Sequence, residues 1–262
     1  MKAASILTSV QPNGVATIKL NRPGVHNALD DVMIADFTQA VRGLGEDAGV
    51  RIVVLKGEGK SFCAGADLNW MRRTADYSDQ ENRRDALALA ELMRTLDELS
   101  KPTIACIQGA ALGGGVGLVV CADIAVAAEE AEFSLSEVRL GLIPAVISPY
   151  VIRAMGPRQA RRLFLTGERF SASEAHRLGL IQEVVPLAEL DQKTEEVSAK
   201  LLQAGPRAQS AAKALIADVA FRPIDDSLMR YTAERIAAVR ASGEGREGVS
   251  AFLEKRAPPW RV

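Results

Sequence analysis

Apolar positions in the first part of the chain fall into short runs, separated by longer stretches with helical spacing. Short apolar runs bounded by turn residues predict buried strands, and apolar residues three and four positions apart predict amphipathic helices. The predicted strands cover residues 5–10, 15–20, 52–56, 103–107, 124–127 and 179–185. The predicted helices cover residues 30–44, 79–100, 116–122, 159–165 and 173–178. Strands that alternate with helices in this way indicate an α/β protein.

The end of the chain has a different pattern, because nearly every segment from about Leu190 to Lys255 has helical spacing. Breaks occur only at Gly205-Pro206, at Arg222-Pro223 and at the glycine turn of residues 243–245. We therefore expect an α/β core over residues 1–195, followed by a C-terminal helical region over residues 196–262.

A glycine-rich turn follows the strand predicted at residues 103–107, where Gly113, Gly114 and Gly115 precede a predicted helix. Glycine allows another group to approach the backbone closely. The start of a helix offers unpaired N–H groups and a partial positive charge. The turn therefore predicts a site for a negatively charged oxygen, either a phosphate or an oxyanion formed during a reaction. A tightly packed loop without chemistry is the alternative interpretation.

A second loop of small residues lies at Ala64-Gly65-Ala66. Two loops that each direct an N–H group at one point describe an oxyanion hole, which suits a carbonyl that becomes an enolate. An acid placed opposite could move a proton at the adjacent carbon. Spacing alone does not choose among the acids near strand and loop ends, which are Asp67, Asp123, Glu129, Glu132 and Glu137.

Other catalytic motifs are incomplete in this sequence, because required residues are missing. Gly59-Lys60-Ser61 resembles the end of a phosphate-binding loop, but Val54 occupies the position of its first glycine. Gly113 and Gly115 begin a dinucleotide fingerprint, but its third glycine is replaced by Leu118. Only two histidines and no GxSxG motif are present, which argues against a Ser–His–acid triad.

Composition narrows the expected partners and location. The chain is 48% hydrophobic and 25% charged with a formal net charge of −1, so a nucleic-acid-binding surface is not expected. No run approaches the roughly 18 apolar residues of a membrane helix, and the first 20 residues lack a signal-peptide core. The three cysteines form no CxxC pair, which is typical of a reducing compartment. We expect a cytoplasmic protein with no nucleic-acid or membrane partner.

Several ordered motifs resemble the crotonase (enoyl-CoA hydratase/isomerase) superfamily across essentially the whole chain. They lie at residues 20–29, 62–68, 109–115, 121–124 and 137–144, with further matches at 167–185 and 247–256. Residues 66–71 together with residues 143–150 look most similar to bacterial methylglutaconyl-CoA hydratases of leucine and acyclic-terpene breakdown.

The resemblance implies a spiral of repeated β-β-α units with a C-terminal helical region that forms trimers, often paired as hexamers. It implies acyl-CoA thioester substrates and neither a metal nor a redox cofactor. Carried over by position, the backbone N–H groups of Ala66 and Gly114 form the oxyanion hole, and Glu137 is a catalytic acid. The residues expected to contact CoA are Val25, Ala64, Asp67 and Leu68, with Phe252 and Lys255 in a tail that sometimes reaches a neighbouring subunit.

One catalytic position departs from the family pattern. Typical hydratases of the family hold water between two glutamates, and the first of these falls at Gly117. The first hypothesis is a hydratase for a branched 2-enoyl-CoA such as 3-methylglutaconyl-CoA, in which Gly117 leaves room for a bulky or carboxylated acyl end and contributes to substrate binding. A substrate carboxylate or a second water would then take the missing role, unless Glu91 replaces the absent acid.

The alternative is a one-acid enzyme, either a Δ3,Δ2-enoyl-CoA isomerase in which Glu137 moves a proton between C2 and C4 or a related lyase. A more remote alternative is a non-enzymatic RNA-binding or interaction protein, against which the net charge of −1 counts. We expect Asp123 to be structural, paired with nearby backbone or an arginine, and His176 to be solvated or packed.

Overall fold

The computed structural model describes residues 4–261. Its larger sheet contains β1 (Ile6–Val10), β2 (Val15–Leu20), β3 (Ile52–Gly57), β4 (Thr103–Ile107), β6 (Ile124–Ala128) and β9 (Glu183–Val185), and the strands lie side by side in that order. β1 and β2 form an antiparallel hairpin, and every later neighbour pairs in parallel. A smaller sheet has the order β5 (Ala111–Leu112), β7 (Glu132–Ser134) and β8 (Arg169–Ser171).

Ten α-helices lie within the described residues. They are α1 (Asp31–Glu46), α2 (Leu68–Thr74), α3 (Asp79–Asp97), α4 (Gly114–Cys121), α5 (Ser148–Thr166), α6 (Ala172–Arg177), α7 (Leu190–Leu202), α8 (Pro206–Val219), α9 (Asp226–Ala241) and α10 (Gly243–Leu253). Three short 3₁₀ segments are η1 (Pro23–Val25), η2 (Ser136–Leu140) and η3 (Leu187–Glu189). None of the helices in residues 4–261 is long and apolar enough to cross a membrane.

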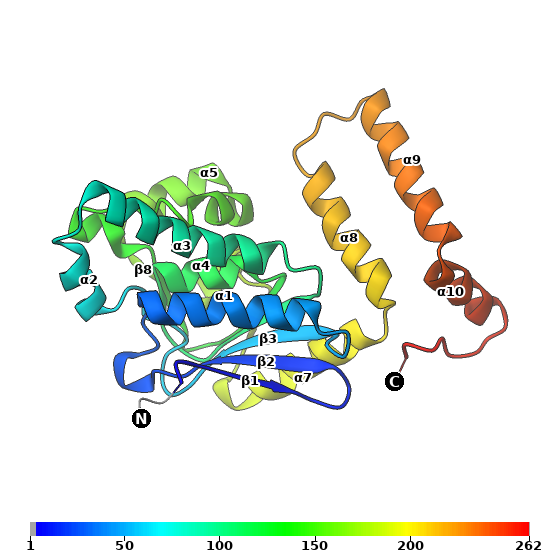
Figure 1. The fold of residues 1–262 in the computed structure, drawn as a ribbon, viewed down its shortest axis with the longest axis horizontal. Helices are drawn as coiled ribbons and strands as arrows, with labels where there is room; N and C mark the ends of the chain where they lie inside the picture. The colour runs from blue at the N-terminus through cyan, green and yellow to red at the C-terminus, as the bar shows by residue number, and fades with distance from the viewer. Residues whose placement is uncertain (1–3, 262) are drawn as a thin grey trace.

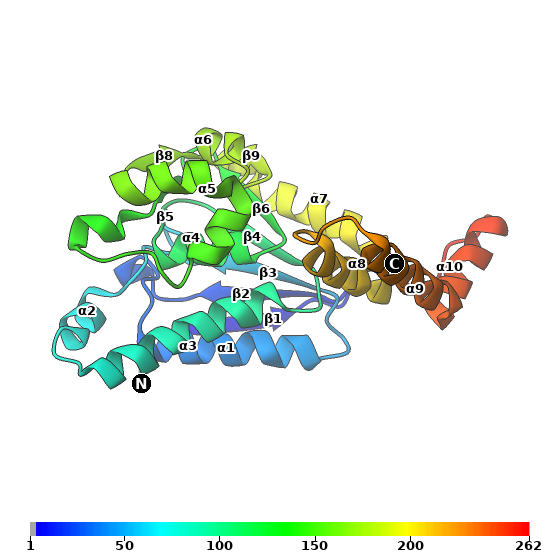
Figure 2. The ribbon, with the colours of Figure 1, turned by 90° about the horizontal axis from the view of Figure 1, so that it is seen from above.

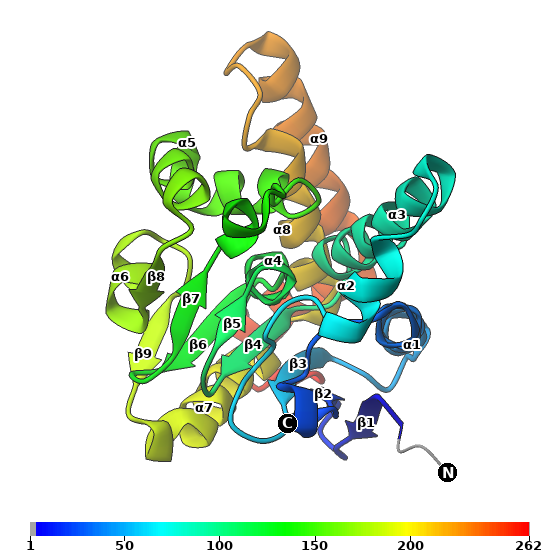
Figure 3. The same ribbon diagram turned by 90° about the vertical axis from the view of Figure 1, so that its left-hand side faces the viewer.

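The two faces of the larger sheet are covered by different helices, as Figures 1 and 3 show. Alternate residues of a strand point to opposite faces. Ile18, Leu55 and Ala105 belong to the core that includes α1, α3 and α4. Val54 and Ile104 face the other way, into the core that includes α7. Because both faces are buried, the parallel strands are apolar at nearly every position.

Local signals explain where the long helices begin. The Asp30 side chain accepts the Met33 N–H at 2.8 Å and caps α1, whose buried face includes Phe37, Val41 and Leu44. α3 starts with a capping box in which Ser78 and Glu81 each bond the other's backbone N–H. The predicted helices over residues 30–44 and 79–100 are therefore confirmed, with small changes at their ends.

Two segments differ from the sequence prediction. α5 begins at Ser148 rather than near Gln159. Its interior contains a kink at Gly156, which has a φ of 78° and precedes Pro157, so one helical stretch before the kink is followed by another after it. Residues 179–181 are not part of a strand, and only Glu183–Val185 pairs with β6.

α8, α9 and α10 extend to one side of the α/β core (Figures 1 and 2). Lys213 of α8 contacts Asp123 at 2.8 Å, and Arg51 donates to the Ala204 carbonyl at 2.9 Å. The expected boundary after residue 195 falls inside α7, whose buried face packs on the sheet. The α/β core and the helical C-terminal part are otherwise as predicted.

Candidate active site

The two loops of small residues lie against each other. Cys63 N–H donates to the Ala110 carbonyl at 3.0 Å, and Leu112 N–H donates to the Cys63 carbonyl at 2.9 Å. A Cβ atom on Gly115 would lie 2.3 Å from the Cys63 carbonyl oxygen, closer than a Cβ can approach. The close approach of the two loops therefore requires glycine at this position.

The Ala66 N–H is directed toward the glycine turn. Leu29 N–H donates to the Gly65 carbonyl at 2.7 Å, and Asp67 N–H donates to the Leu29 carbonyl at 2.9 Å. Ala66 lies between these two bonds, opposite Leu29 in a parallel bridge. Its own N–H consequently points away from Leu29, to the side on which residues 110–114 lie. Within residues 4–261, no acceptor is bonded to this N–H.

The Gly114 N–H is also free of a partner among the described residues. Gly114 is the first residue of α4, and Gly113, with φ 49° and ψ −115°, precedes it without a side-chain cap. The first N–H groups of a helix lack intrahelical acceptors, and the helix dipole places partial positive charge there. Among the described residues, the junction of the two loops thus has two unpaired backbone donors, and the oxyanion role of Ala66 and Gly114 stays a prediction.

The carboxyl group of Glu137 lies against this junction. Its Oε1 would be 3.0 Å from a Cβ atom built on Gly113. Its Oε2 is buried and has no hydrogen-bond partner among the described residues. Burial raises the pKa of the Glu137 carboxyl, and a hydrogen bond from its own backbone N–H only partly offsets this. A carboxylate with a raised pKa holds a proton more strongly than an ordinary glutamate, and this carboxyl can therefore accept a proton and return it.

Asp67 holds the Ala66 loop in place with its side chain. The carboxylate accepts the Asn69 and Trp70 N–H groups at 2.8 and 3.1 Å and caps α2. Its other oxygen lies 2.9 Å from Arg22. Burial alone would raise the pKa of Asp67, but these amides and the guanidinium outweigh it and hold the pKa below its usual value. The predicted contact of Asp67 with CoA stays a prediction.

Arg22 and Asn27 are structural residues of the site whose roles the sequence analysis did not assign. Arg22 also donates to the Ala28 carbonyl at 2.6 Å. Asn27 is fully buried with φ 56°, and its amide donates to the Glu58 and Ser61 carbonyls at 2.9 and 2.8 Å. The loop composition of residues 21–27 was the available signal, because a buried asparagine in a turn bonds backbone groups.

Val25, Ala64 and Leu68, the other predicted CoA contacts, lie on neighbouring loops. Ala64 N–H donates to the His26 carbonyl at 2.9 Å, which places the Val25 turn beside the Ala66 loop. Val25 and Leu68 are 41% and 69% exposed, so both offer apolar side chains to solvent next to the free donors. Their contact with CoA stays a prediction.

Phe252 and Lys255 are not brought to the Ala66–Gly114 junction within one chain. Phe252 is 82% exposed on α10, and Lys255 follows that helix with φ 55°. α10 lies at the far end of the molecule from α2 (Figure 2). A contact of these residues with CoA therefore stays a prediction.

Gly117 does not leave an open space. It is buried in α4, and a Cβ atom there would lie 2.4 Å from Ile147 Cγ2 and 3.0 Å from Met93 Cε. The expectation that Gly117 makes room for a bulky or carboxylated acyl end is therefore wrong, because two apolar side chains already fill that room. Direct substrate binding at Gly117 has no support in this arrangement.

The other acids take structural or surface positions. Glu91 pairs with Arg42 and Arg94, so it does not replace the missing acid at Gly117. Asp123 accepts the Thr103 backbone N–H and hydroxyl at 2.8 and 2.9 Å, as expected, but its charged partner is Lys213 rather than an arginine. Glu129, Glu132 and the histidine at 176 are exposed.

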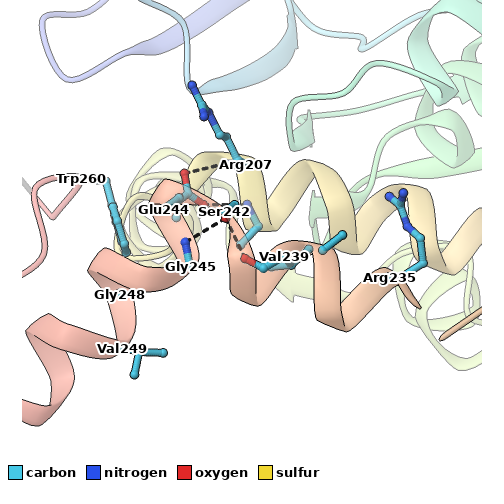
Figure 4. A pocket seen from close by; sticks show the side chains of 12 residues that line it. Arg207, Arg235, Val239, Ser242, Glu244, Gly245, Gly248, Val249 and Trp260 are labelled. Carbon is cyan, nitrogen blue, oxygen red and sulfur yellow. Dashed lines mark hydrogen bonds between the residues drawn. The ribbon is translucent and has the colours of Figure 1, made fainter. Parts of the chain in front are cut away.

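A separate pocket of about 410 Å³ lies where α8, α9 and α10 meet (Figure 4). Its Glu244 accepts the Arg207 and Ala208 N–H groups at 3.1 and 2.8 Å and so caps α8. Trp260 lies over Gly248 at its edge. None of the predicted catalytic residues lines this pocket. Across residues 4–261, no group of three or more His, Cys, Asp and Glu side chains is arranged to hold a metal ion.

Two backbone N–H groups without an acceptor among the described residues and a half-buried carboxyl lie around the junction of the two loops. Groups of these kinds can hold an oxyanion and move a proton at a neighbouring carbon. A family model described as enoyl-CoA hydratase/isomerase matches residues 10–262. An enoyl-CoA hydratase of Shewanella pealeana is 46% identical, with a TM-score of 0.95 over 98% of this chain and 96% of that chain. The chain belongs to the enoyl-CoA hydratase/isomerase family.

Two relatives whose names state a substrate have lower sequence identity to this chain than the Shewanella pealeana protein has. The crotonyl-CoA hydratase of Syntrophomonas wolfei is 33% identical over 92% of each chain. The 2,3-dehydroadipyl-CoA hydratase of Escherichia coli is 30% identical over 94% of this chain and 95% of its own length. The predicted crotonase-like fold and the predicted class of enzyme, an enoyl-CoA hydratase of the crotonase superfamily, are confirmed.

Proposed function

We propose that the protein adds water across the C2=C3 bond of a branched 2-enoyl-CoA through one acid. The single observation that supports this proposal is that the half-buried Glu137 carboxyl lies against the glycine turn, where the Gly114 N–H, like the Ala66 N–H of the adjoining loop, has no acceptor among the described residues. The two donors hold the thioester oxygen, and the catalytic side chain is Glu137.

Each step can be assigned to these three groups. The ionised Glu137 takes a proton from water as the water oxygen bonds to C3. The electrons of the double bond move onto the thioester oxygen, where the Ala66 and Gly114 amides stabilise the enolate. The protonated Glu137 then returns its proton to C2, and the thioester carbonyl re-forms. One donor of an oxyanion hole contributes roughly 10²–10³ in kcat.

The substrate class we propose is 3-methylglutaconyl-CoA or a related intermediate of leucine or terpene catabolism. The resemblance of residues 66–71 and 143–150 to methylglutaconyl-CoA hydratases supports this choice. The name of the E. coli relative describes a substrate whose acyl chain ends in a carboxylate, so this family accommodates such chains.

A second candidate is a Δ3,Δ2-enoyl-CoA isomerase or a related one-acid lyase. The observation that favours it is the apolar packing over Gly117, where Ile147 and Met93 occupy the position of a second acid. In this reaction Glu137 takes a proton from C2 of a 3-enoyl-CoA and returns it to C4, while the same two amides hold the enolate.

Incubation with crotonyl-CoA, a 3-enoyl-CoA and 3-methylglutaconyl-CoA separates the candidates. Uptake of ¹⁸O from labelled water, fastest with 3-methylglutaconyl-CoA, is the expected result. Bond migration without uptake of ¹⁸O would favour the isomerase. Near-full hydration by Glu137→Gln would contradict the assigned role of Glu137. No turnover of any thioester, together with salt-dependent retention on RNA, would contradict both candidates.

We propose further that α8–α10 form the contact between copies in a homotrimer or a hexamer of two trimers. The large exposed apolar side chains of this region support this, and they are Ile216, Phe221, Ile224, Met229, Ile236, Val249, Phe252 and Leu253. The boundary between the α/β core and this region is best placed between α7 and α8. Light scattering should give a mass of three or six chains, and a monomer would contradict the proposal.

A further inference from the structure

The space over Gly117 is filled by two side chains that are distant from it in the sequence. Ile147 is 2% exposed and directly precedes α5, and Met93 is fully buried on α3. A Cβ on Gly117 would meet Ile147 Cγ2 at 2.4 Å, and Met93 Cε and Sδ at 3.0 and 3.1 Å. The three residues therefore form one closed apolar contact among α3, α4 and the start of α5.

On the proposed function, this contact lies close to the reacting carbons of a bound thioester. Gly114 and Gly117 are three residues apart on α4, so they share one face of the helix and are separated by about 4.5 Å along its axis. The Gly114 N–H is the donor to the thioester oxygen in the proposed reaction. C2, C3 and C4 of the acyl chain lie within a few bonds of that oxygen, so they reach the level of Gly117.

Ile147 is fixed by the same segment that carries Glu137. The Leu142 N–H donates to the Glu137 carbonyl at 3.0 Å, and the Ser148 N–H donates to the Ala145 carbonyl at 3.2 Å. The Val151 N–H then donates to the Ile147 carbonyl at 3.1 Å in the first turn of α5. The acid and the apolar side chain are thus held by one continuous stretch of bonded backbone.

We propose that Ile147, backed by Met93, is a specificity-determining residue of this site. Its side chain fills the space over Gly117, limits the bulk of the acyl chain at that point, and keeps a second acid out of position 117. This inference rests on the proposed function for the place of the acyl chain, whereas the packing of Ile147 over Gly117 stands independently of it.

The first test measures binding rather than turnover. Dissociation constants of butyryl-CoA and hexanoyl-CoA, which have no double bond to hydrate, are measured by calorimetry. Ile147→Ala is expected to shift the preference toward hexanoyl-CoA by about 10-fold or more, as one or two methylenes in an apolar pocket do. The matched control is Val151→Ala, because Val151 is fully buried one turn further along α5. An unchanged ratio in Ile147→Ala, or an equal change in Val151→Ala, would overturn the proposal.

The second test isolates the contact over Gly117. Gly117→Ala alone should lower the melting temperature by on the order of 5 °C, because the added methyl overpacks the core. In the Ile147→Ala background, the same substitution should lower it by much less. Equal effects in the two backgrounds would show that Ile147 does not fill this space. If the wild-type protein hydrates no thioester, the proposed function fails, yet both tests still decide the role of Ile147.

Discussion

Arg22 and Asp67 lie 45 positions apart in the chain, and Arg22 Nη2 is 2.9 Å from Asp67 Oδ2. The same nitrogen lies 3.0 Å from Asp30 Oδ2, at the N-cap of α1. One guanidinium therefore joins the start of α1 to the loop that carries Ala66. Asp67 directly follows Ala66, so this contact holds the loop whose bonds to Leu29 direct the Ala66 N–H.

Replacing Arg22 should destabilise the fold and weaken catalysis together. Arg22→Met leaves the Asp67 carboxylate, 5% exposed, without its cation. We expect a loss of about 2 kcal/mol in the free energy of unfolding, less than the ~3–5 kcal/mol of a fully buried pair because Arg22 is 22% exposed. Urea denaturation of the two proteins measures this change in the free energy of unfolding.

The control for this prediction is Arg73→Met. Arg73 pairs with Asp31 on the surface, where the two side chains are 50% and 51% exposed, so the loss should be much smaller than for Arg22→Met. Since the pKa of Asp67 is lowered, its stabilisation is present above the pKa of the unfolded carboxyl and is lost as the pH falls through the folded pKa. The difference between wild type and Arg22→Met should therefore shrink in acid, and a constant difference would contradict this account.

Removing the Gly114 N–H should reduce the rate without unfolding α4. Gly114 is the first residue of that helix, a position that accepts proline because its N–H has no intrahelical partner. Gly114→Pro should lower kcat by roughly 10²–10³. Gly114→Ala adds a Cβ 3.0 Å from Leu29 Cδ1 but keeps the N–H, so it should retain most of the activity. Similar rates for the two variants would argue against the oxyanion role of Gly114.

Glu137→Gln should abolish most of the activity, by about 10²–10⁴ in kcat, because the proton carrier is lost. In the wild type, kcat/KM should fall in acid as Glu137 is protonated, and this acid limb should lie at higher pH than for an ordinary glutamate, since burial raises its pKa. The residual activity of Glu137→Gln should not show this fall of kcat/KM in acid. An unchanged pH profile in that variant would assign the limb to another group.

The same substitution should stabilise the fold at neutral pH. A raised folded pKa means that the native state binds the proton more tightly than the unfolded chain. Stability is then highest below the unfolded pKa and falls as the pH rises through the folded pKa. Glu137→Gln removes this effect, so its melting temperature should exceed that of the wild type at pH 8 and approach it in acid. A lower melting temperature at pH 8 would contradict the placement of Glu137 Oε2, which is buried without a hydrogen-bond partner among the described residues.

Lys213→Met should loosen α8 from the core. Lys213 and Asp123 are 19% and 30% exposed, so the pair is only partly screened by solvent, and we expect a loss of about 1 kcal/mol. Amide hydrogen exchange should accelerate in α8 and leave α1 unchanged. Lys193→Met is the control, since Lys193 lies 3.3 Å from the more exposed Glu183. Unchanged exchange in α8 would show that other contacts hold this helix.

The sequence predicted those features that depend on nearby residues. Asp30 caps α1, and the strand, glycine turn and helix around Gly114 follow one another along the chain. The prediction of two loops with convergent N–H groups followed from small residues at 64–66 and 113–115.

Features made by distant residues could not be predicted in this way. The contact of Ile147 and Met93 with Gly117 joins three separate segments, and no periodicity indicates it. Among five candidate acids, spacing did not select Glu137, and only the resemblance did. Asp67 was expected to bind CoA, but its partner Arg22 shows that the carboxylate has a structural role.

The exposed apolar side chains of α8–α10 affect how stability should be measured. Phe221, Ile224 and Phe252 are 77%, 98% and 82% exposed in the single chain. On the proposed association, burying them couples folding to assembly, so the melting temperature should rise with protein concentration. Dilution would then have two effects. It would lower the stability of the fold by separating the copies, and it would weaken substrate binding by removing any contact that Phe252 and Lys255 make with the substrate of a neighbouring copy.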